Sequence, residues 1–128
     1  MIQFQWSEYI FSSSLQLKPH VLFLLESVEP KRKQLLELGL HEALVNAVVH
    51  GNYNNPEKIV RVRRIVTPNW FIWQIQDNGK GIKNSQRVFS LPTQLDAESG
   101  RGLFLIYQCF DDIRWSKKGN RLQVAIRI

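Results

Sequence analysis

"HEALVNAVVHGN", residues 41–52, is an apolar segment interrupted by a polar stripe. Glu42, Asn46 and His50 recur at four-residue spacing, which places them one turn apart on one side of a helix. A solvated helix face normally carries Lys and Glu, whereas this stripe holds a carboxylate, an amide and an imidazole. The segment therefore predicts a helix with its apolar face in a core. Its polar stripe is either a satisfied polar seam or the lining of a site, and His50 could equally cap the helix end.

The helix that carries this stripe is predicted to begin at Pro30 and to stop at Gly51. Within "KRKQLLELGLHEALVNAVVHG", apolar residues fall at three- and four-residue steps. An earlier helix is predicted over residues 18–28, with Pro19 near its start and Pro30 as its stop. A third, "GRGLFLIYQCF" at 100–110, is expected to be entered through its glycines.

Four segments are rich in β-branched and aromatic residues and predict strands. They are residues 2–11, "IVRVRRIV" at 59–66, "NWFIWQIQ" at 69–76 and "RLQVAIRI" at 121–128. The short "TPN" between the second and third predicts a hairpin. The fold class predicted is α+β: a two-layer sandwich in which a mostly antiparallel or mixed sheet is covered by helices on one face.

A chain of 128 residues fits one domain, so we expect residues 1–128 to form a single domain. The polar segment 78–99 is long for a compact domain and predicts a functional loop, with a mobile lid at about 82–99. No apolar run approaches a membrane span, and the N-terminus lacks a basic segment followed by an apolar run. With a single cysteine, Cys109, these features predict a cytoplasmic protein without membrane association.

The net charge of +6 raises the hypothesis of a nucleic-acid-binding domain. However, the Lys and Arg residues are spread in short groups such as "KRK" and "RVRR", without one dense tract. The distribution favours a solvated or partner-binding surface, and no direct nucleic-acid binding is expected.

The strand "FIWQIQDNG" ends in a carboxylate with unusual placement. Asp77 has the same parity as Phe71, Trp73 and Ile75, so it projects toward the apolar side of the strand. A buried carboxylate needs donors, from the protein or from a ligand's amino group. "DNG" by itself is a common turn signal. The second glycine of "DNGKGI", Gly81, would also let the backbone approach a flat or anionic ligand.

Two further patterns are suited to phosphate chemistry. In "ESGRGLFLI", Gly100 and Gly102 precede an apolar helix whose free N–H groups could hold a phosphate, with Arg101 adding charge. A lone GxG is weak, and these glycines could merely loosen a loop. In the stripe, the Asn46 oxygen could be the one protein ligand of Mg²⁺, and Glu42 could accept a proton from a hydroxyl or water attacking a phosphate.

The three motifs in this order resemble the N, G1 and G2 boxes of the Bergerat-fold ATPases, which include gyrase, histidine kinases and MutL. They read "ExxxNAxxHGN", "DNGKGI" and "SGRGLFLI", and the resemblance covers about residues 35–128. The small size and the wording of the motifs look most like the bacterial anti-sigma-factor serine-kinase branch.

The resemblance implies a role for each matching residue. Asp77 would read the adenine amino group of ATP together with a water, and Gly79 and Gly81 would let the backbone approach the base. Asn46 would hold Mg²⁺ against the phosphates, and Glu42 would be the general base. The remaining matches, which would place backbone donors at the phosphates, are Gly100, Arg101, Gly102 and Leu103.

The same resemblance implies a protein serine kinase that acts on a small anti-anti-sigma (STAS-type) partner protein and also binds a sigma factor. Homodimerisation is common in that branch, and the aromatic N-terminal strand could serve it. Relatives usually carry a Thr in the last strand, and "NRLQVAIRI" has none. The alternative hypothesis is therefore a non-catalytic, nucleotide-dependent protein-binding module, in which ATP only orders residues 82–99.

Overall fold

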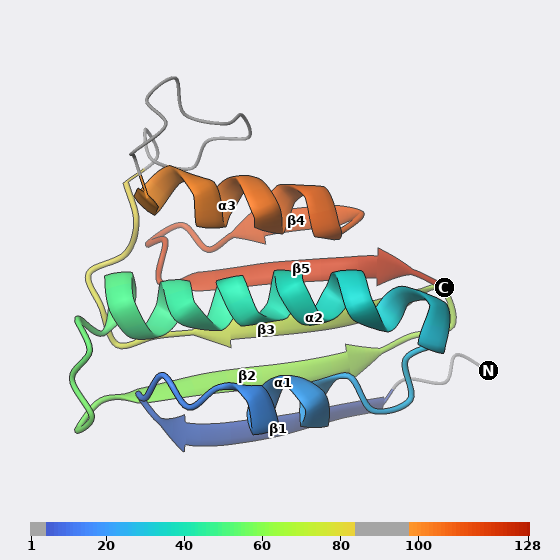
Figure 1. Cartoon of the computed structure of the whole chain (residues 1–128), viewed down its shortest axis with the longest axis horizontal. Coiled ribbons are helices and arrows are strands. Elements are labelled where there is room, and N and C mark those ends of the chain that lie inside the picture. The colour runs from blue at the N-terminus through green and yellow to red at the C-terminus, as the bar shows by residue number, and fades with distance from the viewer. Residues whose placement is uncertain (1–4, 84–97) are drawn as a thin grey trace.

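A computed structural model describes residues 5–83 and 98–128, and for residues 98–101 it describes the backbone alone (Figure 1). The elements follow one another as β1 (Gln5–Ser12), α1 (Lys18–Leu24), α2 (Pro30–Val45), the π-helical turn η1 (Asn46–Gly51), β2 (Ile59–Val66), β3 (Trp70–Gln76), α3 (Glu98–Cys109), β4 (Asp112–Trp115) and β5 (Arg121–Arg127). The predicted lid at 82–99 lies mostly outside the described residues, as does the start of the strand predicted at 2–11.

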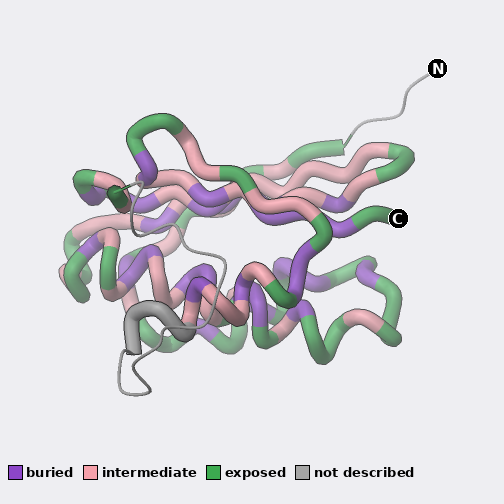
Figure 2. Tube along the Cα trace, turned by 90° about the horizontal axis from the view of Figure 1, so that it is seen from above, coloured by how far each residue is buried: buried purple, intermediate pink, exposed green. Residues whose placement is uncertain are grey.

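The five strands form one sheet in the order β1-β2-β3-β5-β4, and each described pair of neighbours is antiparallel. The helices lie on one side of this sheet, and the other side is left open (Figure 2). The predicted two-layer α+β fold is therefore confirmed, with a sheet that is antiparallel throughout its described strands.

Strand alternation builds the core between the two layers. In β3 the residues Phe71, Trp73 and Ile75 are buried toward the helices, and their neighbours point the other way and are only partly buried. β2 contributes Val60 and Val62 in the same manner. Each of these side chains removes apolar area from water, which is the main favourable term for the fold.

The buried Trp73 also explains why α1 is shorter than predicted. The prediction ran to residue 28, but α1 ends at Leu24, and Ser27 adopts a positive φ of 73°. The indole N–H of Trp73 donates a hydrogen bond of 3.0 Å to the Leu24 carbonyl. This bond satisfies a carbonyl at the end of the helix, while the turn that follows buries Leu25 and Val28 in the core.

A close contact between two helices fixes the position of α3. A Cβ added at Gly39 of α2 would lie 2.6 Å from the Cβ of Cys109 in α3, which is too close for any side chain. Cys109 itself is buried, as expected of a small apolar residue inside a helix. Because α3 lies tightly against α2, its first turns come beside the C-terminal part of α2 (Figure 1).

The predicted regular helix from Pro30 to Gly51 is wrong in its last turn. α2 ends at Val45, and residues Asn46–Gly51 form a π-helical turn instead. The Asn52 N–H donates to the Ala47 carbonyl at 2.8 Å, five residues back. The wider turn accompanies hydrogen bonds from the Asn52 side chain to Ile59 at the start of β2 and to Asn78 after β3.

None of the described helices is long and apolar enough to cross a membrane.

Candidate functional site

Three of the predicted motifs meet at one end of the molecule. Asp77 follows the last residue of β3, Gly51 closes η1, and α3 begins near the same end (Figure 1). The antiparallel order of the sheet and the close approach of α2 and α3 bring these segments together, although they are far apart in the sequence.

Asp77 lies buried at this end, with 7% of its surface exposed. The Gly79 N–H donates a hydrogen bond of 2.7 Å to its Oδ1 atom. Within the described residues, this is the only hydrogen bond that the carboxylate accepts. A Cβ added at Gly51 would overlap the carboxylate, including Oδ2, so the backbone of η1 is in direct contact with it. One carboxylate oxygen is thus occupied, and the other has no donor from the described chain.

Burial raises the pKa of Asp77 above its ordinary value of 3.8. The Gly79 N–H, and then the positive charges of Lys118 and Lys58, act in the opposite direction without cancelling the effect of burial. The carboxylate is therefore incompletely compensated in the isolated protein, and a donor supplied by a ligand would stabilise its charged form.

The loop after Asp77 lies directly against other backbone segments. A Cβ at Gly79 would overlap the Gly51 carbonyl oxygen. Gly81 has a positive φ of 92°, and a Cβ there would overlap the Lys118 carbonyl oxygen. The Ile82 N–H then donates to the Gly119 carbonyl at 3.0 Å. These contacts hold the loop between η1 and the β4–β5 turn, and the approach of its backbone to a ligand stays a prediction.

Glu42 faces the beginning of α3. It is half-buried on α2, and a Cβ added at Gly102 would lie 3.2 Å from its Oε2 atom. Gly102 thus leaves room for the carboxylate. Asn46 lies one turn further along, at the first residue of η1, and is half-buried, whereas His50 is exposed. The structure therefore brings Glu42 to Gly102 and leaves His50 at the outer end of the stripe.

The start of α3 differs from the prediction. Gly100 and Gly102 were expected immediately before the helix, but α3 begins at Glu98 and contains both glycines in its first turns. Leu103 is buried in the core, so only its backbone could face a ligand. The side chain of Arg101 lies outside the described part of the structure.

A metal ion would need ligands from outside the protein at this end. In the described residues, no group of three or more His, Cys, Asp or Glu side chains could hold one. This donor set fits Mg²⁺ bound by one amide oxygen, from Asn46, together with phosphate oxygens and waters.

Asn52 is a residue of this region whose role the sequence did not reveal. It is completely buried, its Nδ2 donates to the Ile59 carbonyl at 2.9 Å, and its Oδ1 accepts from the Asn78 N–H at 2.7 Å. One side chain thus joins the end of η1, the start of β2 and the turn after Asp77. In the sequence, Asn52 follows the glycine of "HGN", where polar residues are common at helix ends. The sequence pattern therefore does not distinguish it from an ordinary helix-terminal residue.

Replacing Asn52 by Ala is expected to lower the free energy of unfolding by about 2–4 kcal/mol, because two part-buried backbone groups lose their partners and a fully buried side chain is truncated. Urea denaturation followed by tryptophan fluorescence measures this. Asn69→Ala is the control, since Asn69 is exposed in the β2–β3 turn. Equal stability of the two variants would contradict the structural role of Asn52.

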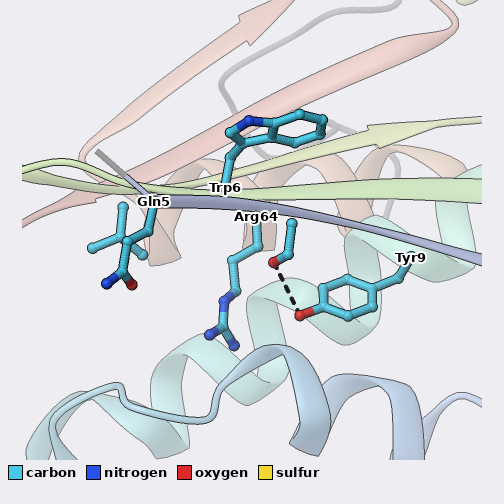
Figure 3. A pocket seen from close by; sticks show the side chains of 6 residues that line it. Gln5, Trp6, Tyr9 and Arg64 are labelled. Carbon is cyan, nitrogen blue, oxygen red and sulfur yellow. Dashed lines mark hydrogen bonds between the residues drawn. The ribbon is translucent and has the colours of Figure 1, made fainter. Parts of the chain in front are cut away.

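A separate hollow of about 560 Å³ lies at the start of β1, away from these motifs (Figure 3). It is lined by Gln5, Trp6, Ser7, Tyr9, Arg64 and Val66. β1 starts and β2 ends at this hollow, whereas Asp77 follows the end of β3 at the opposite end of the sheet. This hollow is therefore not the candidate site.

The antiparallel sheet and its single helical layer define an α+β sandwich domain, with the buried Asp77 beside glycine backbone at one end. The sequence pattern of the histidine kinase-like ATPase domain matches residues 21–126, and the chain belongs to that family.

Several relatives share the name anti-sigma F factor. The protein of that name from Anoxybacillus flavithermus is 29% identical over 99 residues, which cover 73% of this chain and 67% of the relative. The one from Bacillus cytotoxicus has the same identity and coverage. The one from Clostridium kluyveri is 25% identical over 107 residues, covering 79% of this chain and 74% of the relative.

Proposed function

We propose that the protein binds ATP with Mg²⁺ at the end of the fold that holds Asp77. We further propose that it is an anti-sigma regulator acting as a serine kinase on an anti-anti-sigma protein. The observation that carries the proposal is the buried Asp77 carboxylate. Its Oδ1 accepts a hydrogen bond from the Gly79 N–H, and its Oδ2 has no donor among the described residues. The family match and the relatives' shared name support it.

Adenine recognition follows from this carboxylate. The exocyclic amino group of adenine is a hydrogen-bond donor. Oδ2 of Asp77 is an acceptor that receives no hydrogen bond from the described chain. Gly51 and Gly79 carry no side chain, so the backbone next to the carboxylate can lie close to a flat base. Gly81 would shape the loop that leaves the base.

The phosphates would lie toward the first turns of α3. The first N–H groups of a helix have no partners within it, and the helix dipole favours negative charge there. In the first turn of α3 the backbone of Gly100 and Arg101 would provide these donors, whereas Gly102 and Leu103 lie past the first four residues of the helix. Glu42 is held beside Gly102 and therefore near the same group of donors.

Phosphoryl transfer requires positioning more than covalent chemistry by the protein. The serine oxygen of the partner would form a bond to the terminal phosphorus, the bond from that phosphorus to the ADP oxygen would break, and the serine proton would pass to the Glu42 carboxylate. The side-chain oxygen of Asn46 would hold Mg²⁺, which neutralises phosphate charge when bound. Each step uses a residue from the α2, η1 and α3 region.

The proposed partners are an anti-anti-sigma protein of the STAS type and a sigma factor, and the proposed location is the cytoplasm. This assignment rests on the relatives named anti-sigma F factor. We also propose that the protein forms a homodimer.

A second candidate is a nucleotide-dependent binding module without catalysis. It is favoured by β5, which contains no Thr where the resembling kinases usually have one. Incubation of the purified protein with γ-³²P-labelled ATP, Mg²⁺ and an anti-anti-sigma protein distinguishes the two. We expect label on a serine of the partner. ATP binding without label transfer would instead establish the binding module, and absence of ATP binding would refute both.

A further inference from the structure

One side of the sheet faces away from the helices and is left open (Figure 2). The strand pairing gives its side chains an ordered pattern. Strand alternation sends every second residue to this open face, and the strand register aligns these residues in rows across the sheet. The pattern can therefore be read directly from the pairing of the strands.

The central row is apolar. Trp6 pairs with Ile65, Ile65 with Ile72, and Ile72 with Ala125, so the row crosses four strands. Trp6 is 59% exposed, which is unusual for a side chain of its size. Trp70 lies on the same face two residues before Ile72. Apart from Ala125, which is only 2% exposed, the row thus presents aromatic and aliphatic surface that no described helix covers.

Arginines flank this apolar row on both sides. Arg127 pairs with Trp70 on one side, with its guanidinium 5.0 Å from the ring centre. On the other side, two further rows carry two arginines each. They are Arg63 and Arg114 in the nearer row, and Arg61 and Arg121 in the next one. On the described strands, the carboxylates of this face are Glu8 and Asp112.

Both carboxylates are already paired. Glu8 lies 2.8 Å from the Nε of Arg63 and 3.5 Å from that of Arg61, and Asp112 lies 2.9 Å from the Nε of Arg114. Five arginines against two carboxylates leave the face with an excess of three positive charges. The Glu8 pairs also show that carboxylates fit between arginines of neighbouring strands.

We propose that the open face of the sheet is a docking surface for an acidic amphipathic helix of a partner protein. The apolar row would receive the helix's apolar stripe, and glutamates or aspartates beside that stripe would pair with the arginines on either side. Strands lie about 4.8 Å apart, so the three strands that carry Trp6, Ile65 and Ile72 span about 10 Å, which matches about six helical residues at 1.5 Å each.

Charge complementarity favours an acidic helix over two other occupants, a second copy of this chain and a nucleic acid. A second copy placed face to face would bring the arginine rows of the two copies together, which repel. A nucleic acid could use the arginines and stack bases on Trp6 and Trp70, but the aliphatic Ile65 and Ile72 at the centre offer it no ring. An apolar stripe between acidic residues matches the apolar row and the arginines on either side of it.

The four tryptophans provide an internally controlled experiment. Trp6 and Trp70 are on the open face, whereas Trp73 and Trp115 are on the helix side. The probe is a synthetic 14-residue helical peptide with a leucine stripe flanked by glutamates. A matched peptide with lysines in place of the glutamates is the control. Indole N–H signals of the ¹⁵N-labelled protein are followed by NMR during titration.

We expect saturable shifts of the Trp6 and Trp70 signals with the glutamate peptide, and unchanged Trp73 and Trp115 signals. Arg61→Glu combined with Arg121→Glu should weaken binding at least tenfold, and Lys31→Glu combined with Lys33→Glu, on exposed positions of α2, should change it less than twofold. ATP affinity should be the same in both double variants, because the candidate nucleotide site lies on the helix side.

Several results would overturn the proposal. One is binding of the lysine peptide as tight as that of the glutamate peptide. Another is the absence of any shift of the Trp6 and Trp70 signals at millimolar glutamate peptide. Stronger effects of single-stranded oligothymidylate on the same two signals would assign the face to nucleic acid. Self-association that disappears in the Arg61→Glu, Arg121→Glu variant, measured by sedimentation equilibrium without peptide, would assign it to a second copy.

Discussion

Glu42→Ala is expected to lower the rate of phosphoryl transfer to the partner serine by a factor of about 10²–10⁴, while ATP still binds. This is the usual contribution of a positioned general base. The carboxylate lies against Gly102 in the first turns of α3, where it would accept the serine proton. Transfer of ³²P measured in single turnover, with ATP affinity measured separately by equilibrium dialysis, tests this result.

Glu42→Gln gives the sharper version of the experiment, since glutamine keeps the shape of the side chain and cannot act as the base. It should lose as much rate as Glu42→Ala. Glu37→Ala, also on α2 but outside the polar stripe, is the control and should retain the wild-type rate. Full labelling of the partner by Glu42→Gln would refute the assignment of Glu42 as the base.

Asp77→Asn should weaken ATP binding about 100-fold, because a charge-assisted hydrogen bond to the adenine amino group contributes about 3 kcal/mol. Asparagine can still accept the Gly79 N–H bond, so the turn should keep its geometry. Isothermal titration calorimetry measures the affinity. Asp112→Asn, on the open face of the sheet, is the control and should bind ATP as the wild type does.

The same Asp77 variant should be more stable than the wild-type protein at pH 7 in the absence of ATP. Burial raises the folded-state pKa of Asp77 above 3.8, so the folded protein holds this proton to a higher pH than the unfolded chain does. At pH below 3.8 both states are protonated and the two proteins differ least. As pH rises through 3.8 and then through the folded-state pKa, the wild type loses stability relative to the variant.

Above the folded-state pKa the difference should stay constant. Thermal unfolding of both proteins between pH 3 and pH 8 shows whether the curves separate in this direction. A variant that is less stable than the wild type at pH 7 would mean that Asp77 has donors that compensate its charge in the folded protein. Loss of ATP binding with a gain in stability would be expected of a buried charge kept for ligand recognition.

The sequence predicted the layers of the fold because its periodicities are strong. The alternation in "FIWQIQDNG" placed Asp77 on the buried side of β3, and the structure buries it there. Pro30 and the repeated leucines predicted the start and the inner face of α2. Such patterns depend on local geometry, which a single segment records by itself.

Helix ends were predicted less well, because they depend on contacts with distant residues. α1 stops at Leu24, whose carbonyl accepts the Trp73 indole N–H. The π-helical turn at Asn46–Gly51 accompanies the hydrogen bonds of the buried Asn52 side chain to Ile59 and Asn78. These partners lie up to 49 residues away, so the local sequence around each end carries no sign of them.

The sequence by itself determined which residues are candidates for nucleotide binding: the carboxylates Glu42 and Asp77, the amide of Asn46 and the glycines near them. Only the tertiary structure decided their surroundings. It placed the backbone of Gly51 against Asp77 and Gly102 beside Glu42. The reason is physical: residue type and spacing fix which side of an element a group faces, whereas its neighbours and its degree of burial come from how distant elements pack together.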